Sequence, residues 1–435
     1  MALGGGFFLT QNKRLPGTYH NFISKARAFA NLADRGYVAL PDIFDWFADG
    51  VTTVKHEDFQ KNSLKLFGYD YAHEKLLPIR EIFRNAHTVF VHAVNANAVA
   101  ASNDLATAVK KGKRGSDIKI VVTPNVDEPT EWDVLTYIDT TLVDEQTVTG
   151  VGELVPNDYV SFKANATLTA TAGMPLTGGS NGDEPTATPW QNALDEFEAY
   201  GFNALICPTD DSGIKGLFVA YTKRLRDTVG VKFQLVGHDL GATDHEGIID
   251  VHNAVVDRSF EMVYWVGGAA AGCAVNDTNQ NKKYNGEYEV DLTGSKTQLE
   301  LTNLLNAGKY TFHRNGKEIC VLDDINTFTS FTVDKNEDFG MNQVIRVLDQ
   351  NAIDTAHLFN TRYLGLVPND QDGRISLWSD ICKHRGEMQK IRAIQNLTSD
   401  DVGCYKGESK KSVVVEEEIE PTVAMGKLYI TTTVA

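Results

Sequence analysis

Residues 188–208 read TPWQNALDEFEAYGFNALICP, a pattern that predicts a helix ending near Gly201 and a buried strand from Phe202 to Cys207. The stretch LFVAYTKRLRDTVGVKFQLVG (217–237) repeats the order of helix, glycine and strand. We expect GIIDVHNAV (247–255) and FEMVYWV (260–266) to form further strands. Helices that alternate with strands over short loops are typical of a mostly parallel sheet covered by helices. The sequence therefore predicts a central α/β domain over residues 179–320.

The residues before this domain predict two smaller units. Residues 23–94 combine a helical segment, LPIREIFRNA (77–86), with a strand-like segment, HTVFVHAV (87–94), which indicates a mixed α/β segment. Between residues 95 and 178, Thr- and Val-rich runs of alternating polarity such as DIKIVVTP (117–124) are separated by turn residues. Several short strands at this spacing are typical of a small all-β domain.

The C-terminal part predicts two long amphipathic helices at about 339–362 and 375–394, followed by a strand in SVVVEEEIE (412–420). We assign residues 321–420 to an α+β domain. Both chain ends read as arms: residues 1–22 contain a triple glycine and a Pro-Gly turn, and residues 421–435 end in GKLYITTTVA. The β-branched and aromatic residues of that ending favour a strand, and a long unpaired strand invites pairing with another chain.

Composition excludes several classes of protein. The 435 residues include 58 Asp and Glu against 41 Lys and Arg, a formal net charge of −17, which argues against a surface made for nucleic acid or anionic lipid. The five cysteines are widely spaced without a CxxC pair, so neither a disulfide framework nor a zinc site is indicated. The chain carries no pattern of a signal peptide and no apolar run long enough for a bilayer. We expect a soluble protein of a reducing, cytosolic compartment without membrane insertion.

One loop holds a dense set of ionisable side chains. The sequence GHDLGATDHEGIIDVHN (237–253) contains His238, Asp244, His245 and His252, which suit a metal site or acid/base catalysis at the end of a strand. The alternative is an ordinary surface loop, because these residues show no established ligand spacing. GGAAAGC (267–273) is not a phosphate-binding loop, and its small residues are better explained by close helix packing. No catalytic motif is present, so we predict no enzyme, no cofactor and no metal.

A local basic segment stands out on this acidic chain. KHRGEMQKIRAIQ (383–395) carries Lys383, Arg385, Lys390 and Arg392 on a predicted helix with Glu387 as its one acidic residue. Such a helix can dock on an acidic partner, or it can be a solvated helix face. The strand-competent arms at both ends favour the first interpretation, since they indicate a subunit of an assembly.

Motifs along nearly the whole chain resemble the tail sheath proteins of contractile bacteriophage tails, especially the short-sheath type of Gram-positive phages, phage-like elements and R-type bacteriocins. In order, the motifs are GGGFF, LPGTYHNFIS, KLFGYD, LTGGSNG, LDEFEAYGFNALICP, DHEGIIDVHN, DDINTFTS, QVIRVLD, YLGLVPNDQDGR and KLYITTTV. The loop NDTNQNKKYNG (276–286) departs from the Ser/Thr motif that the family carries there. Each motif alone is weak, and the set in sequence order is specific.

The resemblance implies a multidomain α/β protein whose central domain is subtilisin-like and non-catalytic, with a small all-β domain and extended strand arms. It implies stacked hexameric rings around an inner tail tube, contraction that drives the tube through a cell envelope, and contacts with tail tube, baseplate and tail terminator proteins in a virion tail assembled in the host bacterial cytoplasm. The residues it singles out are the subunit-linking arms Phe7, Phe8, Leu9, Thr10, Leu428, Tyr429, Ile430, Thr431, Thr432, Thr433 and Val434, the hinges Gly4, Gly5, Gly6, Pro16, Gly17 and Gly426, and the tube-facing candidates Lys383, Arg385, Lys390 and Arg392. The competing hypothesis is an intracellular α/β hydrolase-like or metal-dependent enzyme that uses the His238–His252 loop.

Overall fold

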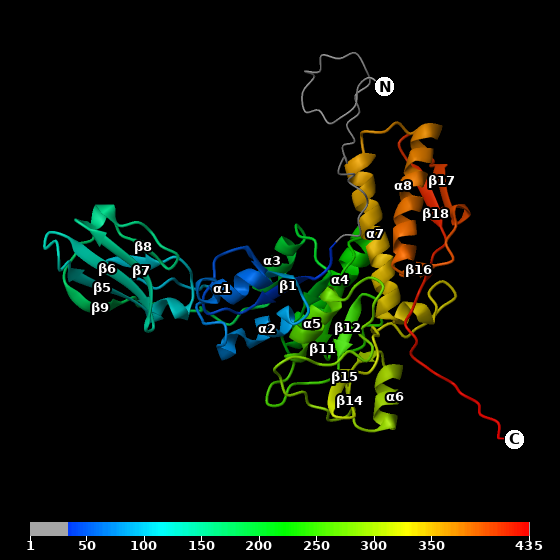
Figure 1. Ribbon diagram of the computed structural model, residues 1–435, viewed down its shortest axis with the longest axis horizontal. Coiled ribbons are helices and arrows are strands. Elements are labelled where there is room, and N and C mark those ends of the chain that lie inside the picture. Colours follow the sequence, from blue (N-terminus) through cyan, green and yellow to red (C-terminus); the bar gives the residue numbers. More distant parts are fainter. Residues whose placement is uncertain (1–33, 435) are drawn as a thin grey trace, which may run out of the picture.

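The computed structural model describes residues 34–434 of the chain. It places three parts in a row: a β-rich part, a central α/β part, and a pair of long helices with short strands (Figure 1). The multidomain α/β architecture predicted from the sequence is confirmed. The predicted N-terminal arm, residues 1–22, lies outside the described residues together with its linking residues 7–10 and its hinges at residues 4–6, 16 and 17.

A seven-stranded sheet forms the centre of the molecule. Its strand order is β13-β12-β11-β10-β1-β3-β2, and every neighbouring pair is parallel except β2 with β3. The strands are β1 (Tyr37–Asp42), β2 (Val51–Lys55), β3 (Thr88–Ala93), β10 (Ala204–Ile206), β11 (Gln234–His238), β12 (Ile248–Val251) and β13 (Lys309–Tyr310). Residues 37–93 and 204–310, which the sequence placed in two segments, therefore contribute to one sheet.

Helices cover both faces of this sheet, so its strands are apolar on both sides. On β1, Val38 and Leu40 point to one hydrophobic core and Ala39 points to the other, as the twofold period of a strand requires. The first core includes α2 and α5, and the second includes α3 and α4. The helices of this part are α1 (His56–Phe67), α2 (Leu77–Phe83), α3 (Ala187–Phe197), α4 (Ser212–Lys223) with a π-helical extension over Arg224–Val229, α5 (Met262–Gly272) and α6 (Gln298–Asn306).

The strand predicted in FEMVYWV is wrong, because these residues lead into helix α5. Its ten residues from Met262 to Ala271 are all buried, so the helix has no polar face. A short run that is apolar on every side carries no period by which helix and strand can be told apart. The expected role of the glycines is confirmed: a Cβ on Gly268 would lie 2.3 Å from Ile82 O, and one on Gly272 would lie 1.9 Å from Asn85 O. Small residues thus let α5 approach the α2 segment closely.

The β-rich part lies where the alternating Thr- and Val-rich runs predicted strands. It contains an antiparallel sheet of order β7-β6-β5-β9 and a second pair, β4-β8. Its strands are β4 (Ala106–Ala108), β5 (Ile118–Pro124), β6 (Trp132–Ile138), β7 (Thr141–Val148), β8 (Val160–Phe162) and β9 (Thr171–Pro175). Alternate residues of β5, Ile118, Ile120 and Val122, enter a separate hydrophobic core.

The C-terminal part is built on a helical hairpin, α7 (Asn342–Arg362) and α8 (Gln371–Lys390), whose packing includes Leu358 and Ile381 (Figure 1). Its strands are β16 (Ile394–Gln395) with β19 (Glu420–Pro421), and β17 (Val402–Lys406) with β18 (Val413–Glu417). The hairpin of β14 (Phe312–Asn315) with β15 (Glu318–Val321) belongs to the central part, because Phe312 and Val321 pack in its first core. The predicted strand over Leu428–Val434 has no partner within the described chain, and its residues are exposed. Within residues 34–434, none of the helices has the length and apolar character needed to cross a membrane.

Candidate functional site: a groove beside the C-terminal hairpin

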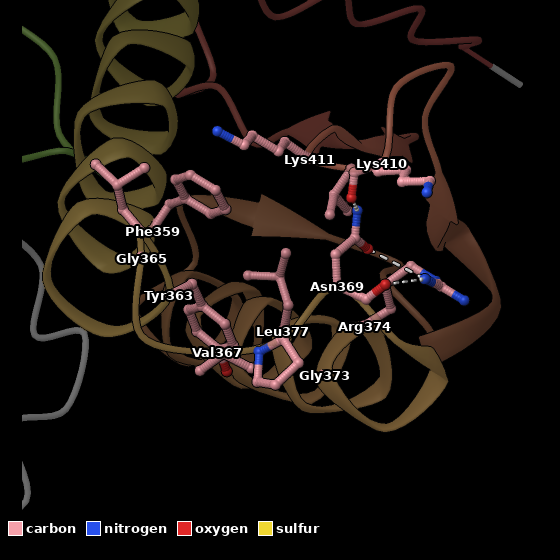
Figure 2. Close-up of a pocket in the computed structure, with 13 residues that line it drawn as sticks. Phe359, Tyr363, Gly365, Val367, Asn369, Gly373, Arg374, Leu377, Lys410 and Lys411 are labelled. Atoms are coloured by element: carbon pink, nitrogen blue, oxygen red, sulfur yellow. Dashed lines mark hydrogen bonds between the residues drawn. The ribbon is translucent and has the colours of Figure 1, made fainter.

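An open groove separates α7 from strand β18. It consists of two adjoining cavities of about 410 Å³ and 530 Å³, whose walls share Phe359, Leu377 and Val413. The end of the groove near the α7–α8 turn is shown in Figure 2, where Tyr363 and Leu377 lie below Phe359. Lys410 and Lys411 line the opposite wall of that end. The groove is therefore mostly apolar with a basic rim.

Strand β18 presents an open edge beside this groove. Within the described chain it belongs to a two-stranded sheet, in which Val413–Glu417 pair with Lys406–Val402 of β17. Val413 and Val415 are half-buried and line the groove, whereas Val414 is exposed. A strand edge next to an apolar groove can bind an extended segment through main-chain hydrogen bonds and alternate side chains.

A buried ionic network holds the groove walls together. Arg385 Nε and Nη2 donate to Glu417 Oε2 and Oε1 at 2.8 and 3.0 Å, which joins α8 to β18. Arg385 Nη2 also donates to Thr355 Oγ1 of α7 at 2.9 Å. Next to it, His384 Nε2 lies 2.8 Å from Asp354 Oδ2. The network joins α7, α8 and β18, the elements that form the groove walls.

The network corrects one tube-facing candidate. Arg385 is 1% exposed and is bound to Glu417, so it is unavailable to an outside partner. Two residues along a helix differ by about 200° in direction, so Arg385 and Lys383 lie on opposite sides of α8. The buried residues Leu377, Ile381 and Arg385 follow one another at intervals of four, a signal present in the sequence.

Lys383, Lys390 and Arg392 are exposed. Lys390 Nζ forms an ion pair with Glu387 Oε1 at 2.8 Å. The assignment of these three residues to a tube contact remains a prediction.

The residues of the histidine loop, which the competing enzyme hypothesis would use, form ionic and backbone contacts. Asp244 Oδ1 accepts hydrogen bonds from the backbone N–H groups of Thr329 and Ser330, which lowers the pKa of its carboxyl. His238 Nδ1 lies 3.6 Å from Asp210 Oδ1. Burial lowers the pKa of His252. These contacts tie the loop to neighbouring segments.

Over residues 34–434, the groups close enough to share a metal ion are Asp227, His245 and Glu246. Of the four residues named by the competing enzyme hypothesis, this set contains His245 alone. His245 Nδ1 accepts the Gly247 N–H at 2.9 Å, which places the proton of a neutral ring on Nε2, 3.1 Å from Asp227 Oδ1. Lys335 Nζ binds Glu246 Oε1 at 2.8 Å. A metal ion would have to displace both a proton and an ammonium group. The arrangement therefore suits ion pairing better than metal binding.

Comparison with known proteins explains the architecture. Family descriptions match consecutive parts of the chain: "Phage tail sheath protein beta-sandwich domain" over residues 94–181, "Phage tail sheath protein central domain" over 183–327 and "Phage tail sheath C-terminal domain" over 334–435. The phage-like element PBSX protein XkdK of Bacillus subtilis (strain 168) is 31% identical, over 98% of this chain and 98% of its own. This chain belongs to the phage tail sheath protein family.

Solved structures agree with this assignment. The sheath tail protein from Desulfitobacterium hafniense is 33% identical with a TM-score of 0.80, covering 95% of this sheath protein and 99% of the other chain. The contracted helical sheath of the anti-feeding prophage has a TM-score of 0.57 at 11% identity, covering 97% of this chain and 99% of that one, and shares its fold. The protein is thus a structural component of a contractile phage tail.

The arm residues were predicted from the sequence, whereas the groove residues were not. Leu428, Tyr429, Ile430 and Val434 are all at least 75% exposed, and Gly426 is exposed as well. The groove of the sheath protein was not foreseen. The stretch VVVEE (413–417) has no alternation of apolar and polar residues, so the sequence did not show which face of β18 lines the groove. The alternation appears only in the burial of the strand, where Val413, Val415 and Glu417 are half-buried.

Proposed function

We propose that this sheath protein polymerises as stacked hexameric rings around an inner tail tube, and that the polymer contracts to drive the tube through the envelope of a target cell. Subunits that associate head to tail form a closed ring when the rotation between neighbours closes, and a helical polymer when it does not. A sheath combines the two, because its rings stack as a helix. The observation that carries the proposal is the open edge of β18 beside an apolar groove, in a chain whose own strand-competent end is exposed.

Subunits are linked by strand donation in this proposal. Leu428–Val434 of one subunit lies along β18 of a neighbour, and at about 3.3 Å per residue it spans about 23 Å of the groove. Alternate side chains, such as Leu428 and Ile430, enter the groove between α7 and β18. Phe7–Thr10 supplies the complementary N-terminal arm. Main-chain hydrogen bonds do not depend on side-chain identity, so the links persist while the subunit bodies rotate.

Contraction is then a rigid-body rearrangement of packed subunits from a long-lived extended state to a more stable short state. Gly4–Gly6, Pro16, Gly17 and Gly426 are the proposed hinges between bodies and arms. The energy resides in the subunit interfaces, so the mechanism needs no nucleotide.

The exposed residues Lys383, Lys390 and Arg392 are the proposed contacts to the tail tube protein. Exposed charge contacts are screened by salt and weak one by one, so they can release when the sheath contracts. Baseplate and tail terminator proteins bind the two ends of the polymer. The sheath is part of the virion tail and is assembled in the host bacterial cytoplasm.

Electron microscopy of recombinant protein tests the proposal. We expect hollow striated tubes or rings from the full chain and dispersed particles from a variant that lacks residues 428–435, because the donated strand is missing. Circular dichroism and the oligomeric state at low concentration verify that the shortened chain is folded. Tubes of normal length from the shortened chain would refute strand donation by the C-terminal arm.

A further inference from the structure

Two hydrogen bonds hold the start of the C-terminal arm on the body of the protein. Thr422 N donates to Ala393 O at 2.9 Å, and Ala424 N donates to Gln343 Oε1 at 3.0 Å. Val423 is 43% exposed, Met425 is fully exposed, and exposure continues through Val434. The hydrogen bond at Ala424 therefore holds a stretch of chain that already lies at the surface, and the exposed arm continues from it.

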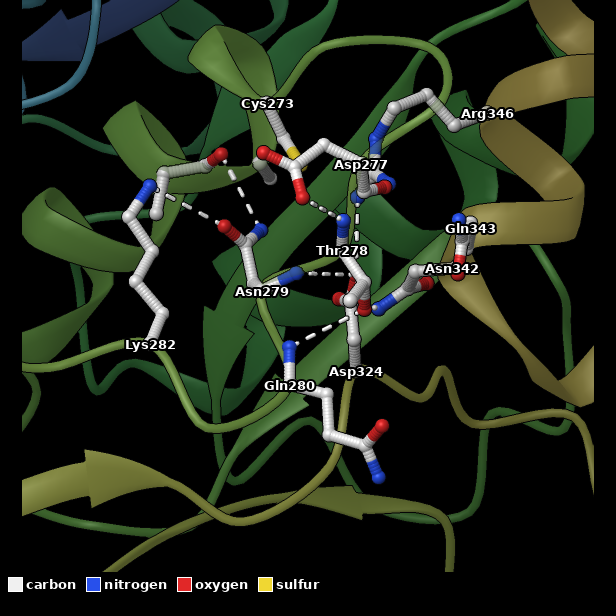
Figure 3. Close-up of polar contacts among 12 residues, drawn as sticks. Cys273, Asp277, Thr278, Asn279, Gln280, Lys282, Asp324, Asn342, Gln343 and Arg346 are labelled. Atoms are coloured by element: carbon white, nitrogen blue, oxygen red, sulfur yellow. Dashed lines mark hydrogen bonds and ion pairs between the residues drawn. The ribbon is translucent and has the colours of Figure 1, made fainter. Parts of the chain in front are cut away.

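Gln343 occupies the junction between three segments. It lies in the first turn of α7 and is 6% exposed. Its Nε2 donates to Asn276 O at 3.3 Å while its Oε1 accepts the Ala424 N–H. One carboxamide thus connects α7, the loop after α5 and the root of the C-terminal arm. In Figure 3, Gln343 and Asn342 lie on α7, to the right of Thr278 and Asp324.

The loop that Gln343 contacts rests on a buried polar base. Asp324 Oδ2 accepts hydrogen bonds from Asn279 N at 3.0 Å and Thr278 Oγ1 at 3.2 Å, and it pairs with Arg346 Nη2 at 3.1 Å. Its Oδ1 accepts from Asn342 Nδ2 at 3.0 Å. Asp324 and Arg346 are 4% and 1% exposed (Figure 3). Buried charges with several partners resist displacement, so loop and helix form a rigid base.

The arm also passes closely over this loop. A Cβ built on Gly426 would lie 2.9 Å from Gln280 Nε2 and 3.1 Å from its Oε1. The end of the Gln280 side chain is flexible and can turn away from such a Cβ, so this contact places the arm beside the loop without requiring a glycine at residue 426. We call residues 276–280, Asp324 and Arg346, on which Gln343 rests, the arm socket.

We infer that Gln343 is a positioning residue for the C-terminal arm: it clamps the backbone of Ala424 to the arm socket, so that the arm bends only beyond this point. The inference rests on the proposed linking role of the arm. A neighbour that holds the arm transmits its load to the body at Ala424. Upstream, the arm root is secured by the β16–β19 pair, which has only two residues in each strand. Without the clamp, the load would open this short pair.

Substitution of Gln343 by leucine tests the inference, since leucine keeps the approximate volume and loses both hydrogen bonds. Gln389→Leu is the control for losing a hydrogen bond from glutamine to the backbone, because the Oε1 of the exposed Gln389 on α8 accepts the Leu397 N–H at 2.9 Å, away from the arm. We expect amide hydrogen exchange at Ala424 to accelerate roughly five- to tenfold in Gln343→Leu, the effect of losing about 1 kcal/mol of hydrogen bonding. We also expect shorter or absent tubes from this variant and normal tubes from Gln389→Leu.

A second variant removes the donor in place of the acceptor. Ala424→Pro lacks the N–H group and leaves Gln343 intact, and the same loss of tubes is expected from it. Unchanged exchange at Ala424 in Gln343→Leu, or full-length tubes from both variants, would overturn the inference. The chain lacking residues 428–435 separates the two proposals. If this shortened chain forms tubes, strand donation by the arm is refuted. If the shortened chain forms no tubes while Gln343→Leu and Ala424→Pro form full-length tubes, strand donation stands and only the role of Gln343 is refuted.

Discussion

Basic residues that lie within two turns of helix α8 differ in their surroundings: one is buried in an ion pair and the others are exposed. Arg385 is buried against Glu417, while Lys383 and Lys390 face solvent. The sequence presents all of them as one basic cluster. Only burial distinguishes a cation that holds the fold together from cations that lie at the surface.

Replacing Arg385 by methionine is therefore expected to destabilise the C-terminal part by about 3 kcal/mol, because Glu417 and Thr355 lose a buried partner. Lys390→Met should leave the free energy of unfolding nearly unchanged, since its ion pair with Glu387 is exposed and screened by solvent. Urea unfolding of both variants measures the difference. Equal effects would mean that the Arg385–Glu417 pair is not a principal contact of the groove walls.

At the scale of elements, helix α5 shows why small residues matter in a fully buried helix. Gly268 approaches the backbone of Ile82 so closely that no side chain fits, whereas a Cβ added to Gly216 in α4 would meet no atom within 4 Å. Helix propensity treats both glycines alike, and packing separates them.

Gly268→Ala should lower the free energy of unfolding by about 1–3 kcal/mol, because the new Cβ forces α5 and α2 apart. Gly216→Ala should instead raise it by about 0.5–1 kcal/mol through helix propensity. Thermal or urea unfolding checks both signs. A stabilising effect of Gly268→Ala would contradict the close contact between the two helices.

At the scale of the whole molecule, the groove and the exposed arm are the two halves of one proposed interface between copies. Ala356 is exposed on α7 and lines the groove, while its neighbour His357 is exposed and does not line it. The two positions therefore separate an effect on the groove from an effect on surface charge.

Ala356→Arg should abolish tubes in electron microscopy, because a long charged side chain occupies the space of the incoming strand. His357→Arg should leave the tubes unchanged, since it adds a similar side chain outside the groove. Both proteins should unfold at nearly the same urea concentration as the parent. Normal tubes from Ala356→Arg would show that the donated strand binds elsewhere.

The sequence by itself determined the elements that repeat a local period. The helix and strand of residues 188–208, the alternating strands of the β-rich part and the two long C-terminal helices all follow from hydrophobic spacing, which is a property of neighbouring residues. Motifs in order along the chain likewise identified the family before any contact was known.

Tertiary structure alone decided the rest. Helix α5 has no polar face, so its type depended on the helices and strands around it. Three contacts join residues at least 18 positions apart in the sequence: Arg385 with Glu417, Asp227 with His245, and Gln343 with Ala424. Such contacts form only because the tertiary fold brings distant segments of the chain together. The periodicity of neighbouring residues does not show which segments those are.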